Sequence, residues 1–204
     1  MHIDRIGVRI AGRAVAIIAV GAASAGCGGA HHASPSASSS AASTSSSAVT
    51  GPPSAQPTDY GALLIKPNDV GGGLTAPQSP MLNPNNAPGV AQLFANADSS
   101  RRLWDTIVVA ADPAGAAAEL AATQGSYTGK VNGTWQPLAV GAHGVTISGT
   151  APDNSQAMTV LVFTEGKALV TLEFDNAPND PVDPAVAVDI GRKQDAAIKN
   201  GLPG

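Results

Sequence analysis

The sequence predicts an α+β domain: a twisted antiparallel sheet of about five strands with helices packed on one face. Apolar, partly β-branched runs recur from Val90 onward, and their mostly short connections favour antiparallel pairing. Two Asp-Pro pairs, at 112–113 and 183–184, have the chemistry of helix starts. A break in composition marks where the domain begins, because no Asp, Glu, Lys or Arg lies between Arg13 and Asp59.

Residues 1–26 are typical of a lipoprotein signal peptide. The basic n-region holds three arginines, Arg5, Arg9 and Arg13. Residues 14–25 are small and apolar, and are too few for a bilayer span of about 20 residues. The ending Ala25-Gly26-Cys27 resembles a bacterial lipobox, although Ser24 stands where Leu is usual. The resemblance implies cleavage before Cys27 and a lipid on its sulfur.

Cys27 is the only cysteine, so it cannot form an intramolecular disulfide. The alternative is an ordinary signal peptide, cut at a nearby small residue, that leaves a free thiol prone to oxidation. A cysteine directly after the apolar run has a purpose only in lipid attachment. We therefore expect an exported protein anchored to the outer face of the cell membrane by a lipid on Cys27.

Residues 27–58 comprise this cysteine and a linker. The stretch 33–58 consists almost entirely of Ser, Ala, Thr and Pro and carries no charge. Such a segment buries too little apolar surface to offset its ordering entropy, so we expect a disordered tether. Ser/Thr/Pro composition also makes O-linked glycosylation a hypothesis for this segment.

The domain is expected to span residues 59–204. Residues 62–70 predict a short helix or turn, and four prolines within 77–89 predict a long loop. Residues 90–97 predict a strand. Residues 101–110 predict a stronger one, because three β-branched residues follow one another there.

Asp112 as N-cap and Pro113 in the first position predict a helix through the alanine-rich stretch 114–123. Gly125 is expected to end this helix. The segment 131–140 is ambiguous.

Three strands and a helix complete the domain. Residues 145–149 predict a short strand, and 157–164 and 168–174 predict two long ones joined by a Glu-Gly-Lys hairpin turn. In the last strand Thr171 and Glu173 alternate with apolar residues, which indicates one wetter face. Residues 184–200 predict the final helix, with Val186, Ile190 and Ala197 on its apolar side.

The charge of the domain argues against nucleic acid as a partner. From Asp59 onward eight Lys and Arg stand against fourteen Asp and Glu, a formal net charge of −6. An acidic domain without a basic patch does not attract a phosphate backbone.

Two clusters of polar residues are candidate binding sites. Arg101 and Arg102 with Trp104 suggest an anion or sugar site, and the alternative is solvated charge at a strand edge. Asp175, Asp180 and Asp183 are weak candidates for calcium. Their spacing does not match an EF-hand, and turn and N-cap roles explain the same residues, so we expect no metal and no cofactor.

Enzymatic activity has little support. His143 is the only histidine in the domain, and no Gly-x-Ser-x-Gly elbow accompanies it. We therefore expect a protein that is not an enzyme, with a hydrolase as the least supported reading.

Three stretches carry a family resemblance: 62–71 (ALLIKPNDVG), 105–123 (DTIVVAADPAGAAAELAAT) and 160–174 (VLVFTEGKALVTLEF), the last followed by a final helix containing 189–198 (DIGRKQDAAI). Together they resemble mycobacterial cell-envelope lipoproteins related to the extracellular sensor domain of PknH-type kinases. The resemblance implies an extracytoplasmic sheet with a ligand cleft and no catalysis. The kinase domains are cross-linked by disulfides, whereas this domain has no cysteine.

The expected function is therefore that of a membrane-anchored envelope lipoprotein, sensor-like or scaffold-like, whose domain binds an unidentified small molecule or envelope protein. The alternative is a lipid or glycolipid carrier, which needs an apolar pocket of several hundred Å³.

Overall fold

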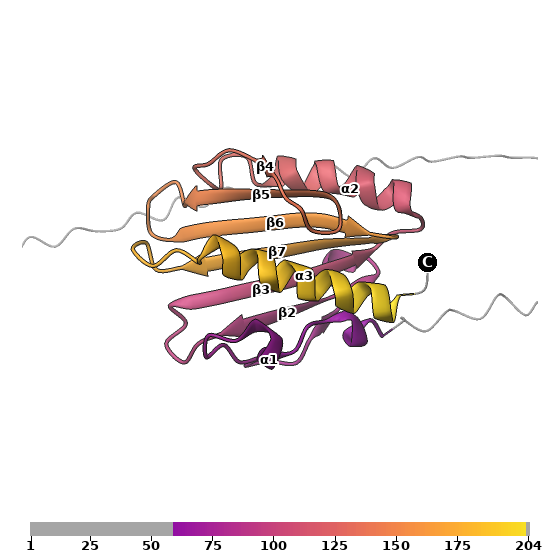
Figure 1. Cartoon of the computed structure of the whole chain (residues 1–204), viewed down its shortest axis with the longest axis horizontal. Helices are drawn as coiled ribbons and strands as arrows, with labels where there is room; N and C mark the ends of the chain where they lie inside the picture. The colour runs from indigo at the N-terminus through magenta and orange to yellow at the C-terminus, as the bar shows by residue number, and fades with distance from the viewer. Residues whose placement is uncertain (1–58, 203–204) are drawn as a thin grey trace, which may run out of the picture. The chain divides into compact units, whose positions relative to one another are not determined.

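The computed structural model describes residues 59–202, and a seven-stranded, fully antiparallel open sheet organises them (Figure 1). The strand order is β1-β2-β3-β7-β6-β5-β4. The five long strands are β2 (Gly89–Ala95), β3 (Arg101–Val109), β5 (Ala142–Thr150), β6 (Ala157–Glu165) and β7 (Ala168–Asn176). The α+β class and the antiparallel sheet are confirmed. The predicted signal peptide, Cys27 and the linker lie outside the described residues.

Two short edge strands raise the strand number above the expected five. β1 (Met81–Leu82) lies within the proline-rich stretch predicted as loop, and β4 (Gln136–Pro137) lies in the ambiguous segment. Each has only two residues, so neither shows the alternation that predicts a strand. Proline is tolerated in β4 because an edge strand has one side free of ladder hydrogen bonds.

Two helices begin at the predicted Asp-Pro pairs. Asp112 accepts a hydrogen bond from the Gly115 amide at 2.7 Å, and Asp183 accepts one from the Ala185 amide at 2.7 Å. The helices and 3₁₀ turns are η1 (Gly61–Leu63), α1 (Pro67–Val70), η2 (Pro84–Asn86), α2 (Pro113–Ser126) and α3 (Pro184–Gly201). α2 does not stop at Gly125 as predicted, and the chain leaves the helix at Tyr127, whose side chain is buried.

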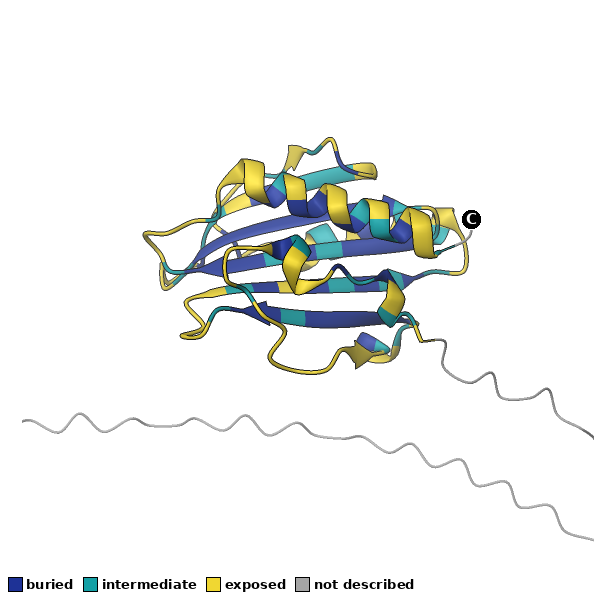
Figure 2. Cartoon of the chain, turned by 60° about the horizontal axis from the view of Figure 1, so that its bottom comes forward, coloured by how far each residue is buried: buried dark blue, intermediate teal, exposed yellow. Residues whose placement is uncertain are grey.

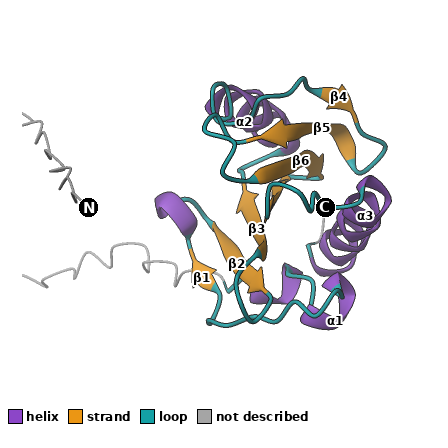
Figure 3. Ribbon diagram, turned by 90° about the vertical axis from the view of Figure 1, so that its left-hand side faces the viewer, coloured by secondary structure: helices purple, strands orange, loops and turns teal. Residues whose placement is uncertain are grey.

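The helices cover both faces of the sheet, not one as expected. Side chains at alternate positions of β6 point to opposite faces. Leu161 and Phe163 pack in the cluster that contains Ala187, Ile190 and Ile198 of α3, together with residues from η1 and α1. Val160 and Val162, whose side chains point to the opposite face, pack in a second cluster with Leu120 of α2. Figure 3 shows α2 and α3 on opposite sides of the strands. We call these the α3 face and the α2 face.

The buried stripe of α3 differs from the predicted one. Val186 is 48% exposed, whereas the buried positions of the helix are Ala187, Ile190, Gly191, Gln194 and Ile198. These positions follow the three- and four-residue spacing of one helix face, and Val186 falls beside it. Figure 2 shows this alternation of buried and exposed positions along α3 above mostly buried strands. Among residues 59–202, no helix combines the length and the apolar character that crossing a membrane requires.

Candidate functional site

A pocket of about 470 Å³ opens where β7 passes into α3. Segments far apart in the sequence meet there: the residues after α1, the start of β3, the end of β7 and the first turns of α3. Its apolar lining comprises Val70, Leu74, Phe174, Pro181, Val182, Val186 and Ile190. Its volume and mainly apolar lining match those of small-molecule sites, and we call it the β7–α3 pocket.

An ion pair forms the polar part of this pocket. Arg101 donates from Nε to Oδ2 of Asp180 at 2.7 Å, and the two side chains are 47% and 49% exposed. Asn176 donates from Nδ2 to the Asp180 carbonyl oxygen at 2.9 Å, which holds the loop between β7 and α3 in place. The pocket thus combines an apolar lining with the half-exposed Arg101–Asp180 pair, and Arg102 and Asp183 also border it.

The structure divides the predicted Arg-Arg-Trp cluster between the two faces of the sheet. Neighbouring residues of a strand point to opposite faces. Arg101 therefore reaches Asp180 on the α3 face, while the Arg102 guanidinium and Trp104 lie on the α2 face. Arg102 also borders the β7–α3 pocket, but its guanidinium pairs with Asp175. Arg101 and Asp180, which come from two different predicted clusters, are brought together.

On the α2 face, Trp104 lies between one leucine and a group of polar side chains. Its direct cross-strand neighbours are Leu93 on β2 and Glu173 on β7. Glu173 accepts a hydrogen bond from the Tyr127 hydroxyl at 2.5 Å. Arg102, two positions from Trp104, forms an ion pair with Asp175 at 3.3 Å. We call this set the Trp104 face; Tyr127 was not singled out in the sequence, and Glu173 was noted only for its alternation with apolar residues.

Burial shapes the titration of this face. It raises the pKa of Asp175, the charge of Glu173 adds to the rise, and the guanidinium of Arg102 opposes it. Burial and the neighbouring Glu173 also raise the pKa of Tyr127, so its hydroxyl remains a donor at neutral pH. One oxygen of Asp175, Oδ1, and Nε of Arg102 are buried without a partner among residues 59–202.

The three aspartates considered for calcium do not converge. Asp175 pairs with Arg102, Asp180 pairs with Arg101, and Asp183 caps α3. Within the described part of the chain, no three His, Cys, Asp or Glu side chains are grouped so that they could hold a metal ion.

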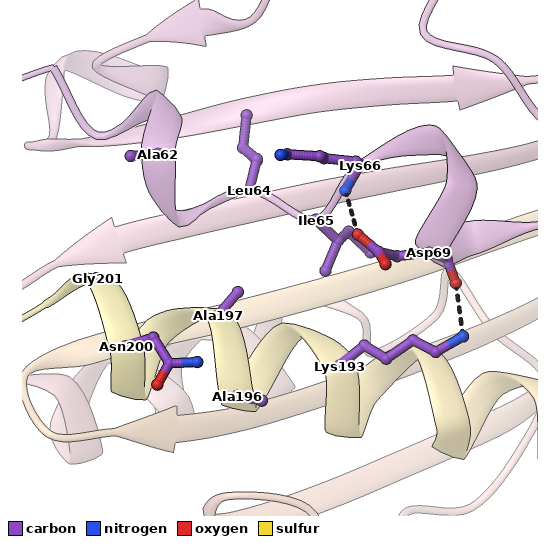
Figure 4. A pocket seen from close by; sticks show the side chains of 10 residues that line it. All are labelled: Ala62, Leu64, Ile65, Lys66, Asp69, Lys193, Ala196, Ala197, Asn200 and Gly201. Carbon is purple, nitrogen blue, oxygen red and sulfur yellow. Dashed lines mark hydrogen bonds between the residues drawn. The ribbon is translucent and has the colours of Figure 1, made fainter.

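A second pocket, of about 450 Å³, separates η1 and α1 from α3 (Figure 4). Two of its polar residues, Lys193 and Asp69, are engaged in structural bonds. Lys193 donates from Nζ to the Asp69 carbonyl oxygen at 2.8 Å and pairs with Asp189 at 2.9 Å. The carboxylate of Asp69 accepts from the Lys66 amide at 2.9 Å. These bonds tie α1 to α3.

No protein-family model matches the sequence, and no curated protein matches it. Among solved structures, the chain is similar to the extracellular domain of PknH from Mycobacterium tuberculosis, with a TM-score of 0.52 and 10% sequence identity. The match covers 71% of this chain and 98% of that domain. At this identity the likeness is one of fold, and it agrees with the layout on which the sequence resemblance rests.

Proposed function

We propose that this chain is a non-enzymatic binding protein of the cell envelope, held at the membrane by a lipid on Cys27, whose domain takes a small ligand in the β7–α3 pocket. The observation that carries the proposal is the convergence of an apolar floor and the Arg101–Asp180 pair in one pocket. A fold shared with an extracellular domain supports an extracytoplasmic location.

The chemistry of the pocket favours an amphipathic ligand. The apolar floor takes an apolar body, whose burial contributes about 25 cal/mol for each Å² removed from water. The Arg101–Asp180 pair is half exposed, and such pairs contribute only about 0 to 1 kcal/mol. A ligand carboxylate or phosphate can therefore replace Asp180 as the partner of Arg101 at little cost, and gains a charge-assisted hydrogen bond.

A lipid or glycolipid carrier is the second candidate, and the mainly apolar lining favours it. A carrier and a sensor use the same pocket in this account. They differ in the ligand: a carrier purified from the cells that produce it holds one lipid molecule per protein.

The test is co-purification of the ligand with the full chain, followed by solvent extraction and mass spectrometry. Val186 stands half exposed in the pocket wall, so Val186→Trp fills the pocket without touching the core. We expect a compound enriched with the wild-type chain, depleted at least tenfold in Val186→Trp and retained in the matched Val186→Ala variant. Equal recovery from the wild-type and Val186→Trp chains would show that the ligand lies elsewhere.

A further inference from the structure

Trp104 is a large aromatic residue exposed to solvent on β3, a strand whose other apolar residues are buried or half-buried. It is 37% exposed, although tryptophan is among the most buried residues on average. α2 packs on β6 and β7, and in Figure 3 it lies away from β2. The indole therefore faces solvent on the part of the α2 face that α2 leaves open.

Hydrogen-bonding groups flank this indole on two sides. Glu173 stands across the strand pair, about 5 Å away between Cβ atoms, and Arg102 stands about 7 Å along the strand. Both are held in place, Glu173 by the Tyr127 hydroxyl and Arg102 by the buried carboxylate of Asp175. Arg102 remains 33% exposed; its Nε is buried, so the donors it can offer a ligand are the N–H groups of its two Nη atoms. The site is pre-organised, which lowers the cost of binding.

The formal charges of this surface cancel. Arg102 and Lys130, whose ammonium lies 5.3 Å from the centre of the Tyr127 ring, balance Glu173 and Asp175. A surface of this kind attracts neither anions nor cations strongly. It instead offers hydrogen-bond donors and acceptors around one flat apolar group, the Trp104 indole.

We infer that the Trp104 face binds neutral sugar rings of a glycan. The C–H face of a pyranose is apolar and stacks on an indole, while its hydroxyls are both donors and acceptors that suit Arg102 and Glu173. A protein partner fits less well, because Trp104 and Leu93 alone provide little of the apolar centre that protein interfaces require. The inference concerns a different site from the β7–α3 pocket, which lies on the other face and shares only Arg102 with the Trp104 face.

The test probes the full chain in detergent on an array of neutral gluco-, manno-, galacto- and arabino-oligosaccharides, with sulfated and uronic-acid analogues beside them. We expect neutral glycans to be bound. Trp104→Ala should weaken the affinity about tenfold or more, and Glu173→Gln should weaken it less. Arg101→Ala is the matched control, because that arginine points to the α3 face, and it should keep wild-type affinity. Val186→Trp should keep it too, which separates this site from the pocket.

Fluorescence gives a readout that does not depend on how Trp104→Ala folds. In the Trp135→Phe background Trp104 is the only tryptophan, and the bound oligosaccharide should shift its emission. The inference is overturned if no neutral glycan binds, if the charged analogues are preferred, or if Trp104 emission stays constant during titration. Equal loss of affinity in Arg101→Ala and Trp104→Ala overturns it as well.

Discussion

At the level of single residues, Asp105 is the most costly side chain in the core. It lies on β3 between Leu103 and Ile107 on the α3 face, and it is completely buried. Neither carboxyl oxygen has a hydrogen-bond partner among the described residues. Burial raises the pKa of Asp105 to about 8, so the folded protein holds this carboxyl mainly protonated at neutral pH.

The stability of the domain should therefore fall as the pH rises. Because the folded pKa of Asp105 lies above its unfolded value, the folded state binds the extra proton. The contribution of this proton to the free energy of unfolding is complete below about pH 4. It is lost toward pH 8, at about 1.4 kcal/mol for each pH unit. We expect Asp105→Asn to remove this slope, measured by urea unfolding at pH 5 and pH 7.5. Glu119→Gln, an exposed change on α2, should keep it. A slope that survives in Asp105→Asn would contradict the assignment.

Neighbouring residues explain why the candidate sites were only partly predictable. Arg101, Arg102 and Trp104 are adjacent in sequence, but strand geometry sends the first to one face and the other two to the opposite one. The polar character of Glu173 was visible as alternation with apolar residues. Its partner Tyr127 was not, because 46 residues separate the two and no local pattern links them.

At the level of elements, Gln194 ties α3 to the beginning of the domain. Its side chain is completely buried in the middle of the helix. Oε1 accepts from the Ile65 amide at 3.1 Å, and Nε2 donates to the Leu63 carbonyl oxygen at 2.8 Å. One side chain thus satisfies two buried backbone groups between η1 and α1.

Replacing this side chain should cost more than its own two bonds. Gln194→Leu fits the apolar surroundings but leaves both backbone groups unpaired, so we expect a loss of about 2 to 4 kcal/mol in the free energy of unfolding. Denaturant titration measures it. The matched control is Gln124→Leu on α2, where we expect a change within about 0.5 kcal/mol. Similar losses in the two variants would show that Gln194 acts only as core volume.

Helix and strand patterns predicted most elements but not which face each helix covers. The run from 157 to 163 is apolar apart from Thr159 and shows no alternation, and it forms β6, which is buried on both faces. A strand of this kind needs cover on both faces, and α2 supplies it on one side and α3 on the other. The final helix was placed correctly, but Val186 was wrongly assigned to its buried side. The assignment followed apolar character alone, whereas the centre of the buried side is the polar residue Gln194.

At the level of the whole molecule, the proposal joins a binding domain to a lipid anchor. The domain at residues 59–202 is ordered around its own core. The anchor rests on Cys27 and the pattern before it. Two or three acyl chains on one residue would hold the domain stably at a membrane, since each buried CH₂ contributes about 0.8 kcal/mol.

The anchor can be tested apart from the ligand. We expect Cys27→Ala to shift the protein from the membrane fraction to the soluble fraction, or to leave it as uncut precursor, in fractionated cells probed by immunoblot. The matched control is Ser24→Ala, which leaves the cysteine in place and should remain processed and membrane-bound. A Cys27→Ala chain that is still processed and membrane-bound would contradict lipid attachment.

The binding claim itself is tested most directly by mapping the ligand onto the residues of the domain. Methyl and aromatic NMR signals of the full chain are recorded in detergent while an organic-solvent extract of the cell envelope is added. We predict that the signals that shift belong to Leu74, Phe174 and Ile190, which line the β7–α3 pocket. Signals that shift only outside this pocket, or that do not shift at all, would contradict the account.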